Sequence, residues 1–471
     1  MAGECDPTRR DFVRVAGAVT AATADNTFSA PAIQKVKAAG SSVSCGVVGT
    51  GERGRCLLRH MARLDNGRCV AVCDIDEANL NSGIAAAEAN PQGYQDYREL
   101  LARKDIAAVV IATPLYTHFP IIRDALLAGK HVFCESALVF KPQEVHELRA
   151  LASESPKQVL QVGLVRRYSA YYQAAKMMVA KGLIGNVTHI IAQWHRNPGW
   201  QMRPYVAREK ESNWRLYREY SGGLAAELVS HQIDVASWMF GYQPEFVMGI
   251  GGQEFIRDGR DIYDNIQLIY RYPRGQKFIC TAISTNQHLP LFGETRAEFG
   301  ERIMGTGGTI EITLGTDDQP GIALWYYEPR PKRVTTVSKY EEGTIATATL
   351  GSFGYGTKGY PILLDRDLLR GDESFLVREM KYARRWLYSK GLMLPEEARS
   401  PVEVQMESFF NCCRTGARPK ADLTIGLANS TAVILSNLAM DQERRVYFSE
   451  IEKLGRSQAP TGQEVLGGTP K

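Results

Sequence analysis

The stretch VSCGVVGTGERG, residues 43–54, places three glycines, Gly49, Gly51 and Gly54, directly after a short apolar run. The spacing G-x-G-x-x-G between a strand and a helix is typical of a dinucleotide-binding turn. Such glycines permit a tight turn and close approach of the backbone to a pyrophosphate, and the following helix directs its free N–H groups at the phosphates. We therefore predict a cofactor-binding turn made of Gly49, Thr50, Gly51, Glu52, Arg53 and Gly54.

The next apolar run supports this interpretation. It spans residues 69–73 and ends in Asp74, twenty residues after Gly54, where a carboxylate would accept hydrogen bonds from the adenosine ribose. Ile75 and Asp76 follow, so this position offers no arginine for a 2′-phosphate. The sequence predicts NAD, with NADP less favoured, and the alternative is a glycine-rich turn that binds no ligand.

The composition argues against several other classes of protein. The chain has 471 residues, 23% of them charged, a net charge of +4 and no long basic run, so we expect no nucleic-acid partner. No uninterrupted apolar run approaches the roughly 18 to 20 residues that span a bilayer, so we expect no membrane insertion. Most of the nine cysteines lie in expected buried strands without C-x-x-C spacing, which favours free thiols and no metal site.

The first 38 residues differ in character from the rest. Arg9 and Arg10 are followed by Phe12 and Arg14, and then by small, mildly apolar residues from 15 to 24. This pattern resembles a twin-arginine export signal, and the alternative is a chance arginine pair. We predict a signal peptide at residues 1–38, export to the periplasm in the folded state, and a disordered tail at residues 455–471.

Strands and helices alternate between residues 41 and 165. Apolar, strand-like runs at 107–112, 131–135 and 158–163 are separated by helical stretches. This alternation predicts a Rossmann domain, that is, a doubly wound parallel sheet of the α/β class that binds ligands beyond the carboxyl ends of its strands.

The pattern changes between residues 166 and 450. Strand-like runs at 187–194, 266–272 and 278–284 follow one another with few helices between them. They predict a substrate-binding α+β domain with an open, mostly antiparallel sheet.

With these pieces in place, the chain resembles the Gfo/Idh/MocA oxidoreductases from about residue 43 to 448. Besides the glycine motif, the resemblance rests on Thr113-Pro114 followed by His118, on Glu135, and on Gly222-Gly223 followed by Glu227, His231 and Asp234. It implies that nicotinamide and substrate meet at the junction of the two domains, and that a homo-oligomer forms through the C-terminal sheet. It also implies further cofactor-binding residues, namely Thr113, Pro114, His118 and Glu135.

Two positions depart from the family pattern. The family usually continues from the strand-end glutamate into Lys-Pro, and that lysine hydrogen-bonds the reacting hydroxyl, whereas Ser136 and Ala137 follow Glu135 here. Ser136 can exchange hydrogen bonds with substrate, but it supplies no charge for a developing alkoxide. The second departure is Glu227, where an aspartate is common in the sugar dehydrogenases.

The pair Glu227 and His231 is the candidate catalytic group. The two residues are four positions apart and are expected on one face of a helix. A histidine with an ordinary pKa of about 6.5 suits proton abstraction from a hydroxyl while hydride leaves the same carbon. We predict His231 as the base and Glu227 as the residue that orients its ring or binds a sugar hydroxyl. Asp234 is expected either to contact substrate or to stabilise the helix.

An aromatic and basic segment precedes this helix and includes Trp194, Arg196, Trp200 and Trp214. Flat rings stack on sugars, which favours a carbohydrate platform, and the alternative is an exposed loop that packs on a neighbouring subunit. The predicted substrate-binding residues are Arg167, Tyr168, Trp194, Arg196, Asp234 and Ser136.

These predictions converge on an NAD(P)-dependent oxidoreductase that acts on a sugar or sugar derivative by hydride transfer. An exported enzyme without a pool of free dinucleotide would hold its cofactor tightly and reset it within each cycle. One alternative is a redox-cycling NAD-dependent glycosidase, which oxidises the sugar, eliminates the aglycone, adds water and returns the hydride. The other is a non-catalytic, nucleotide-dependent sugar-binding protein, in which Glu227 and His231 would be idle.

Overall fold

The structure is a computed structural model that describes residues 42–197, 199–203, 206, 209–286, 299–314, 321–328, 359–390 and 392–454. The predicted signal peptide at 1–38 and the predicted tail at 455–471 lie outside these residues.

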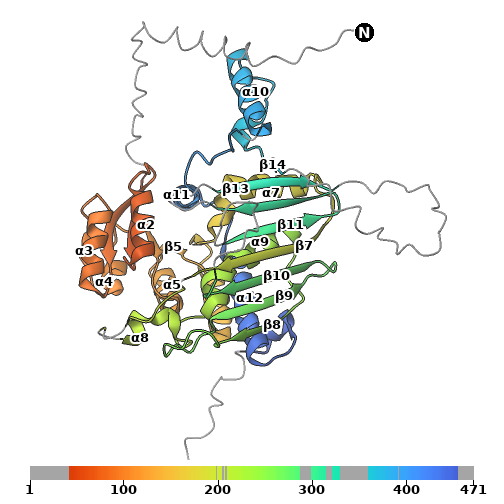
Figure 1. Cartoon of the computed structure of the whole chain (residues 1–471). Coiled ribbons are helices and arrows are strands. Elements are labelled where there is room, and N and C mark those ends of the chain that lie inside the picture. The colour runs from red at the N-terminus through yellow and green to blue at the C-terminus, as the bar shows by residue number, and fades with distance from the viewer. Residues whose placement is uncertain are drawn as a thin grey trace, which may run out of the picture. The chain divides into compact units, whose positions relative to one another are not determined.

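Six parallel strands form the first sheet, in the order β3-β2-β1-β4-β5-β6 (Figure 1). Their bounds are β1 Val43–Val48, β2 Gly67–Cys73, β3 Gln92–Tyr94, β4 Ala108–Ile111, β5 His131–Cys134 and β6 Leu160–Val162. The central strand β4 is buried along its whole length, as expected for a strand covered by helices on both faces. The predicted doubly wound sheet is confirmed.

Helices cover both faces of this sheet, and one of them comes from far along the chain. One face packs against α4 (Tyr97–Ala102), α5 (His118–Leu127) and α6 (Pro142–Glu154). The other packs against α2 (Glu52–Met61) and α11 (Pro401–Thr415).

Helix α11 is an integral part of that second layer. Its Phe409 ring lies 5.8 Å from the ring of Phe133 in β5, and the Phe410 ring occupies the space beside Gly67, where a Cβ would come within 2.2 Å of it. A segment expected in the second domain therefore completes the core of the first.

Nine strands form the second sheet, in the order β14-β13-β12-β11-β7-β10-β9-β8-β15. Their bounds are β7 Val187–His195, β8 Phe246–Gly252, β9 Asn265–Arg271, β10 Lys277–Ile283, β11 Phe299–Gly305, β12 Gly308–Thr313, β13 Ile322–Tyr327, β14 Tyr360–Pro361 and β15 Val446–Tyr447. Neighbouring strands are antiparallel except β7 and β10, which pair in parallel. The predicted open, mostly antiparallel sheet is confirmed.

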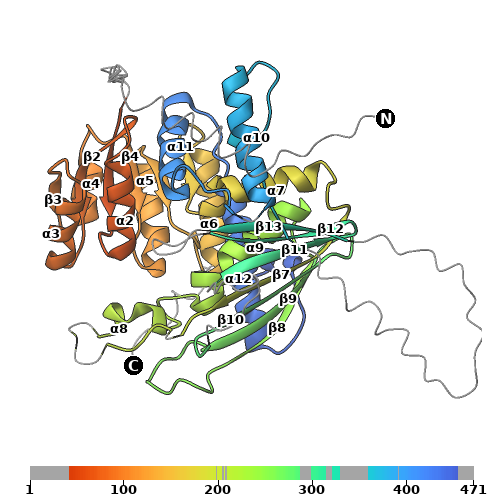
Figure 2. The same cartoon turned by 45° about the horizontal axis from the view of Figure 1, so that its top comes forward.

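Three helices, α7 (Ala170–Ala180), α9 (Ser230–Phe240) and α12 (Leu423–Asp441), pack on one face of this sheet, and no described helix covers the other (Figure 2). Among the described helices, α12 alone is long and apolar enough to cross a membrane, but 67% of its most apolar stretch is buried within the protein. Its place against β8 and α9 is that of a core helix.

Candidate active site

The turn after β1 leaves open space beside the N-terminus of α2. Gly49 has a φ of +88°, and a Cβ there would lie 2.7 Å from the backbone of Ala112. A Cβ on Gly54 would lie 1.9 Å from the carbonyl oxygen of Gly49, so both positions require glycine. At Gly51, the N-cap of α2, a Cβ would meet nothing within 4 Å. A pyrophosphate fits this space, where the helix N-terminus presents its free N–H groups.

Asp74 reaches from the end of β2 to the same turn. Its Oδ2 accepts hydrogen bonds from the Thr50 amide at 2.7 Å and the Thr50 hydroxyl at 3.3 Å, and its Oδ1 accepts one from the Asp76 amide at 3.0 Å. These bonds hold the carboxylate beside the glycine turn, where the ribose of a dinucleotide lies in this fold. Glu52 is exposed in the first turn of α2.

Arg53 and Glu135 meet across the carboxyl ends of the first sheet. The Arg53 Nε lies 2.7 Å from the Glu135 Oε1, and the Glu135 side chain lies over Gly163 at the end of β6. The two residues were predicted separately, from different motifs, and the structure brings them together as an ion pair.

Thr113, Pro114 and His118 lie beside this turn, at the carboxyl end of β4. The ring nitrogens of the buried His118 lie 2.9 Å from the Ala137 carbonyl oxygen and 3.0 Å from that of Thr113. Burial lowers the pKa of His118, so its neutral ring carries one N–H and donates to one of these two carbonyl oxygens. Both ring nitrogens lie against the protein backbone.

A cavity of about 650 Å³ opens beyond these strand ends, towards the second sheet. Arg53, Glu135, Trp194 and His231, all predicted site residues, are among those that line it. Glu227 and the remaining predicted substrate-binding residues are not among its lining residues.

His231 is the second residue of α9 and lies partly buried at the cavity wall. Its Nδ1 has no hydrogen-bond partner within the part of the chain that the structure describes, and its ring centroid lies 6.1 Å from that of Trp194. Burial, together with the cations Arg166 and Arg53, lowers the pKa of His231 well below 6.5. The imidazole is therefore neutral at neutral pH and able to accept a proton.

Glu227 lies in a π turn, Ala225–Val229, and not in the α-helix that the sequence predicts. Such turns are frequent at functional sites. Its carboxylate pairs with the Arg215 Nε at 3.1 Å, and it makes no hydrogen bond to the unpartnered Nδ1 of His231. The arrangement therefore does not include the predicted orienting contact.

Arg166 supplies a second guanidinium group to the cavity wall. Its buried guanidinium lies 3.2 Å from the Glu301 carboxylate through Nε, and 5.3 Å and 5.2 Å from the ring centroids of Trp194 and Phe299. The Tyr172 hydroxyl donates to the same carboxylate. The sequence shows two adjacent arginines, but only the fold of η2 (Val165–Tyr168) determines which of them lines the cavity.

Its neighbour Arg167 forms a buried ion pair with Asp234 outside this cavity. The Nε and Nη2 atoms of Arg167 lie between 2.7 Å and 3.0 Å from the Asp234 carboxylate oxygens. The two residues join η2 to α9, which favours the stabilising role for Asp234 over the predicted contact with substrate. Tyr168, which follows Arg167 in the sequence, is buried and does not line the cavity.

Ser136 and Arg196 lie at the margins of the site. The Ser136 hydroxyl donates to the hydroxyl of Ser230, the residue before His231, at 3.4 Å. The Arg196 amide extends the pairing of β7 with β10 by donating to the Ile283 carbonyl oxygen at 2.9 Å.

The loop before α11 adds residues from the far end of the chain to the cavity wall. Glu396, Glu397 and Arg399 line it, and Arg399 pairs with Glu403 and Glu407 of α11 at 2.7 Å and 2.8 Å. No local pattern signals this contribution, because it depends on the return of α11 to the first sheet.

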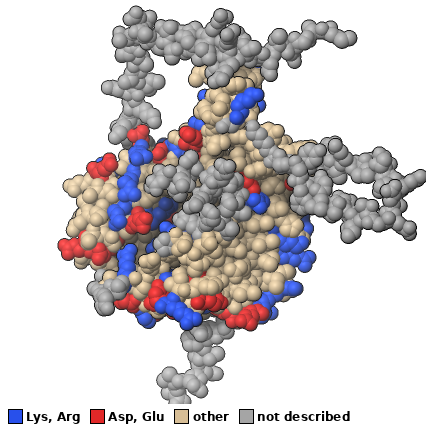
Figure 3. All heavy atoms as spheres, in the orientation of Figure 1, with Lys and Arg blue, Asp and Glu red and all other residues tan. Residues whose placement is uncertain are grey.

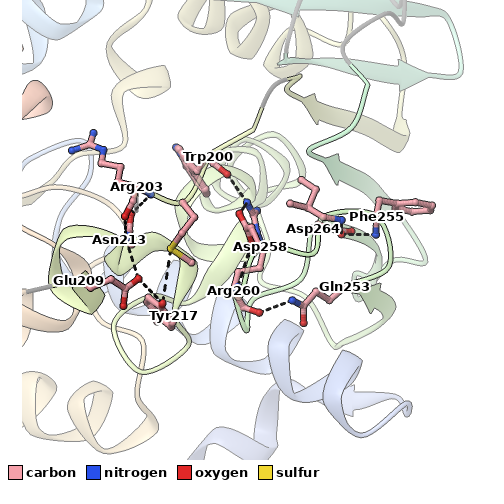
Figure 4. Close-up of polar contacts among 12 residues, drawn as sticks. Trp200, Arg203, Glu209, Asn213, Tyr217, Gln253, Phe255, Asp258, Arg260 and Asp264 are labelled. Atoms are coloured by element: carbon pink, nitrogen blue, oxygen red, sulfur yellow. Dashed lines mark hydrogen bonds and ion pairs between the residues drawn. The ribbon is translucent and has the colours of Figure 1, made fainter. Parts of the chain in front are cut away.

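Figure 4 shows polar contacts among residues of 200–203 and 209–217 and of the loop 253–264. The buried Arg260 donates to the Trp200 carbonyl oxygen at 2.6 Å. Asn213 accepts a hydrogen bond from the Arg203 amide at 2.9 Å and donates to its carbonyl oxygen at 3.0 Å. These bonds tie Trp200 to the loop 253–264 and Arg203 to Asn213.

Two tryptophans of the predicted platform contact a cation. The Arg215 guanidinium lies 4.4 Å from the ring centroid of Trp214 and 5.5 Å from that of Trp200, in addition to its ion pair with Glu227. The three side chains thus form one cluster with Glu227, separate from the cavity that His231 lines.

Two family models match this chain. One is described as "Oxidoreductase family, NAD-binding Rossmann fold" and matches residues 43–164, and the other is the "GFO/IDH/MocA C-terminal domain" and matches residues 172–311. Together they cover more than half of the 471 residues.

Individual relatives agree with these models. An inositol 2-dehydrogenase of Rubrobacter xylanophilus is 28% identical over 271 residues, which are 57% of this chain and 71% of that protein. A glycosyl hydrolase family 109 protein of Shewanella sp. (strain ANA-3) is 30% identical over 240 residues, which are 46% of this chain and 52% of the relative. The chain thus matches about half the length of the latter protein.

A solved structure shares the fold. Scyllo-inositol dehydrogenase from Lactobacillus casei, with bound NAD(H) and scyllo-inositol, superposes with a TM-score of 0.59 at 18% identity, covering 87% of this chain and 99% of that one. The predicted NAD-binding Rossmann domain and oxidoreductase class are confirmed, and the chain belongs to the Gfo/Idh/MocA oxidoreductase family.

Proposed function

We propose that this oxidoreductase oxidises a hydroxyl group of a sugar or sugar derivative, with His231 as the base. The observation that carries the proposal is the partly buried, neutral imidazole of His231, which lines a cavity continuous with Arg53 and Glu135 of the cofactor domain. Proton abstraction needs such a base next to the carbon that loses hydride.

Different side chains would bind the cofactor, accept the proton and stabilise negative charge. Bound NAD would supply the hydride acceptor, held by the glycine turn and by Asp74. His231 takes the hydroxyl proton, while the guanidinium groups of Arg166 and Arg53 favour negative charge on the reacting oxygen. The indole of Trp194 offers a flat surface for the apolar face of a sugar ring.

The relatives support this substrate class. Their names include inositol 2-dehydrogenase and scyllo-inositol dehydrogenase, and cyclic polyols and pyranose sugars both present ring hydroxyls. To test the proposal, purified protein is incubated with NAD and a panel of inositols and aldoses, and NADH formation is followed. His231→Ala should abolish turnover and leave NAD affinity unchanged. Full turnover by this variant would remove His231 from the chemistry.

A redox-cycling glycosidase is the second candidate function. Ser136 stands where the family usually has a lysine, and the glycosyl hydrolase family 109 protein is 30% identical to the matched part of this chain. This candidate predicts cleavage of aryl glycosides with solvent deuterium at sugar C2 and no net NADH. Ser136→Lys should lower that cleavage but should raise simple oxidation, by up to roughly a hundredfold. One-way oxidation without deuterium at C2 would exclude the glycosidase.

We further propose that the chain is exported to the periplasm by the twin-arginine route and retains its cofactor. The proposal rests on Arg9, Arg10 and the residues after them, which lie outside the described part of the chain. Replacing both arginines by lysine should keep the protein in the cytoplasm on fractionation, whereas export of the variant would contradict the route. Denatured protein should release NAD after dialysis, and its absence would contradict retention.

We also propose a homo-oligomer formed through the open face of the second sheet. Met248 of β8 faces Ile269 of β9 across the ladder, and both are exposed on this face together with Ile250. Figure 3 shows few charged side chains over these strands. Ile250→Glu should lower the oligomer mass in sedimentation velocity, and an unchanged mass would contradict this interface.

A further inference from the structure

Helix α10 (Phe375–Ser389) directs its polar side towards the protein and its apolar side outward. It follows β14, an edge strand of the second sheet, and projects beyond that sheet in both views (Figures 1 and 2). A surface helix of a soluble monomer has the opposite arrangement, with its apolar stripe against the core.

Polar bonds attach the inner side of α10. Lys381 donates through Nζ to the Leu368 carbonyl oxygen at 2.6 Å, and Arg384 through Nε to the buried Asp367 at 2.8 Å. The Tyr388 hydroxyl donates to the same carboxylate at 3.4 Å. Positions 381, 384 and 388 are spaced three and four apart and share one face of the helix.

The opposite face is apolar and exposed. Phe375, Tyr382 and Trp386 recur at seven and four residues, which places them on one stripe, with Leu376 and Met380 beside it. The turn after the helix adds three more exposed apolar residues, Leu392, Met393 and Leu394. We call the outward-facing, exposed apolar residues between 375 and 394 the α10 surface: Phe375, Leu376, Met380, Tyr382, Trp386, Leu392, Met393 and Leu394.

The area of the α10 surface is sufficient for a stable contact. Its eight side chains are between 39% and 78% exposed. If an aromatic side chain presents roughly 150–250 Å² when free and a leucine or methionine somewhat less, they expose on the order of 700 Å² together. A stable interface buries about that area on each partner, and the largest apolar patch of a typical monomer is smaller.

The charges on this helix favour a protein partner over a lipid surface. Glu379 lies between Phe375 and Trp386 on the apolar stripe, and its carboxylate would have to enter the acyl region of a bilayer. Arg378 and Arg385 flank the stripe. One face therefore carries both an acid and two cations among apolar side chains, which makes it complementary to itself, as a two-fold contact between identical surfaces requires.

We propose that the α10 surface is a dimer interface that pairs with the α10 surface of a second copy of this chain. It lies on a different element from the open sheet face, and it involves no residue of the cavity. Association at the α10 surface is measured as mass in solution, and sugar oxidation is measured as NADH formation, so either proposal can fail without the other.

The test measures mass in solution for full-length protein. The double variant Phe375→Glu, Leu376→Glu should weaken association at the α10 surface about 100-fold or more, since two large apolar contacts are lost. Sedimentation velocity should then show a species of half the wild-type mass. Turnover of a sugar substrate and the far-UV circular dichroism spectrum should not change, because α10 is attached by its opposite face.

Charge swaps identify the partner as a second copy. Glu379→Lys should weaken association, and adding Arg378→Glu and Arg385→Glu on the same chain should restore it. A control at an exposed charged site far from α10, Lys104→Glu, should leave the mass unchanged.

Wild-type protein that is monomeric, or a double variant with unchanged mass, would overturn the proposal. Flotation of such a monomer with phosphatidylglycerol vesicles would instead identify a lipid surface as the occupant of the α10 surface. No flotation would leave a segment of the same chain as the occupant.

Discussion

Removing one partner of the Arg167–Asp234 pair should destabilise the protein far more than it changes substrate binding. Both side chains are buried, and three nitrogen–oxygen distances between 2.7 Å and 3.0 Å join them. Asp234→Ala leaves a guanidinium buried without its counter-charge, which costs about 3–5 kcal/mol of unfolding free energy. At roughly 2 °C per kcal/mol for a large domain, the melting temperature should fall by about 6–10 °C.

The assay compares melting temperature, by differential scanning fluorimetry, with KM for a sugar substrate. The matched control is Asp441→Asn, because Arg218 and Asp441 form a similar pair at 2.7 Å that is well exposed and worth less than about 1 kcal/mol. The double variant Arg167→Met, Asp234→Leu should recover most of the lost stability, because it leaves no buried charge. An Asp234→Ala variant with an unchanged melting temperature and a raised KM would refute the stabilising role and restore Asp234 as a substrate ligand.

Three further predictions follow from the site. Gly51→Ala should lower NAD affinity without changing the melting temperature of the cofactor-free protein, because its Cβ would point into the open space beside the turn. Gly54→Ala should lower the melting temperature itself, because its Cβ would lie 1.9 Å from the Gly49 carbonyl oxygen. Calorimetry of both variants measures these effects. Because the pKa of His231 is lowered, the base stays deprotonated at pH 6.5, so kcat/KM should fall only at more acid pH. Arg166→Met should raise this pKa, so that kcat/KM begins to fall at a higher pH than in the wild type. A pH–rate profile of both proteins measures this. Asp74→Ala should weaken NAD binding by about 1–3 kcal/mol in isothermal titration, and equal affinity would remove Asp74 from the cofactor site.

Most strands and helices of the first domain could be predicted from local sequence patterns. Prediction of the strands in the second domain was less complete, because several of them depend on partners that are distant in the sequence. β3 was missed because it has only three residues, of which Gln92 and Gly93 are exposed and Tyr94 alone packs against the core. β8 was hard to predict because it contains three glycines, and β11 because it contains Glu301, whose carboxylate is fully buried. A strand with a buried charge is acceptable here because Arg166, distant in sequence, compensates it.

The same distinction holds within the site. The glycine turn, Asp74 and Glu135 follow from spacing along short segments, and the structure places them around one edge of the sheet. The partners of Glu227 and Asp234 are arginines that fold back from other elements, so sequence spacing alone suggested contact with substrate for residues that the structure shows paired with Arg215 and Arg167. Their roles in turnover stay predictions until the variants are measured.

Helix α11 has a consequence for the order of synthesis. Phe409 and Phe410 complete the apolar core that holds Val47 of β1, Leu57 of α2 and Phe133 of β5, and they leave the ribosome more than 270 residues after Phe133. A nascent chain released before α11 would expose this core to solvent and to chaperones. The nucleotide domain, although first to be translated, is therefore among the last parts to close.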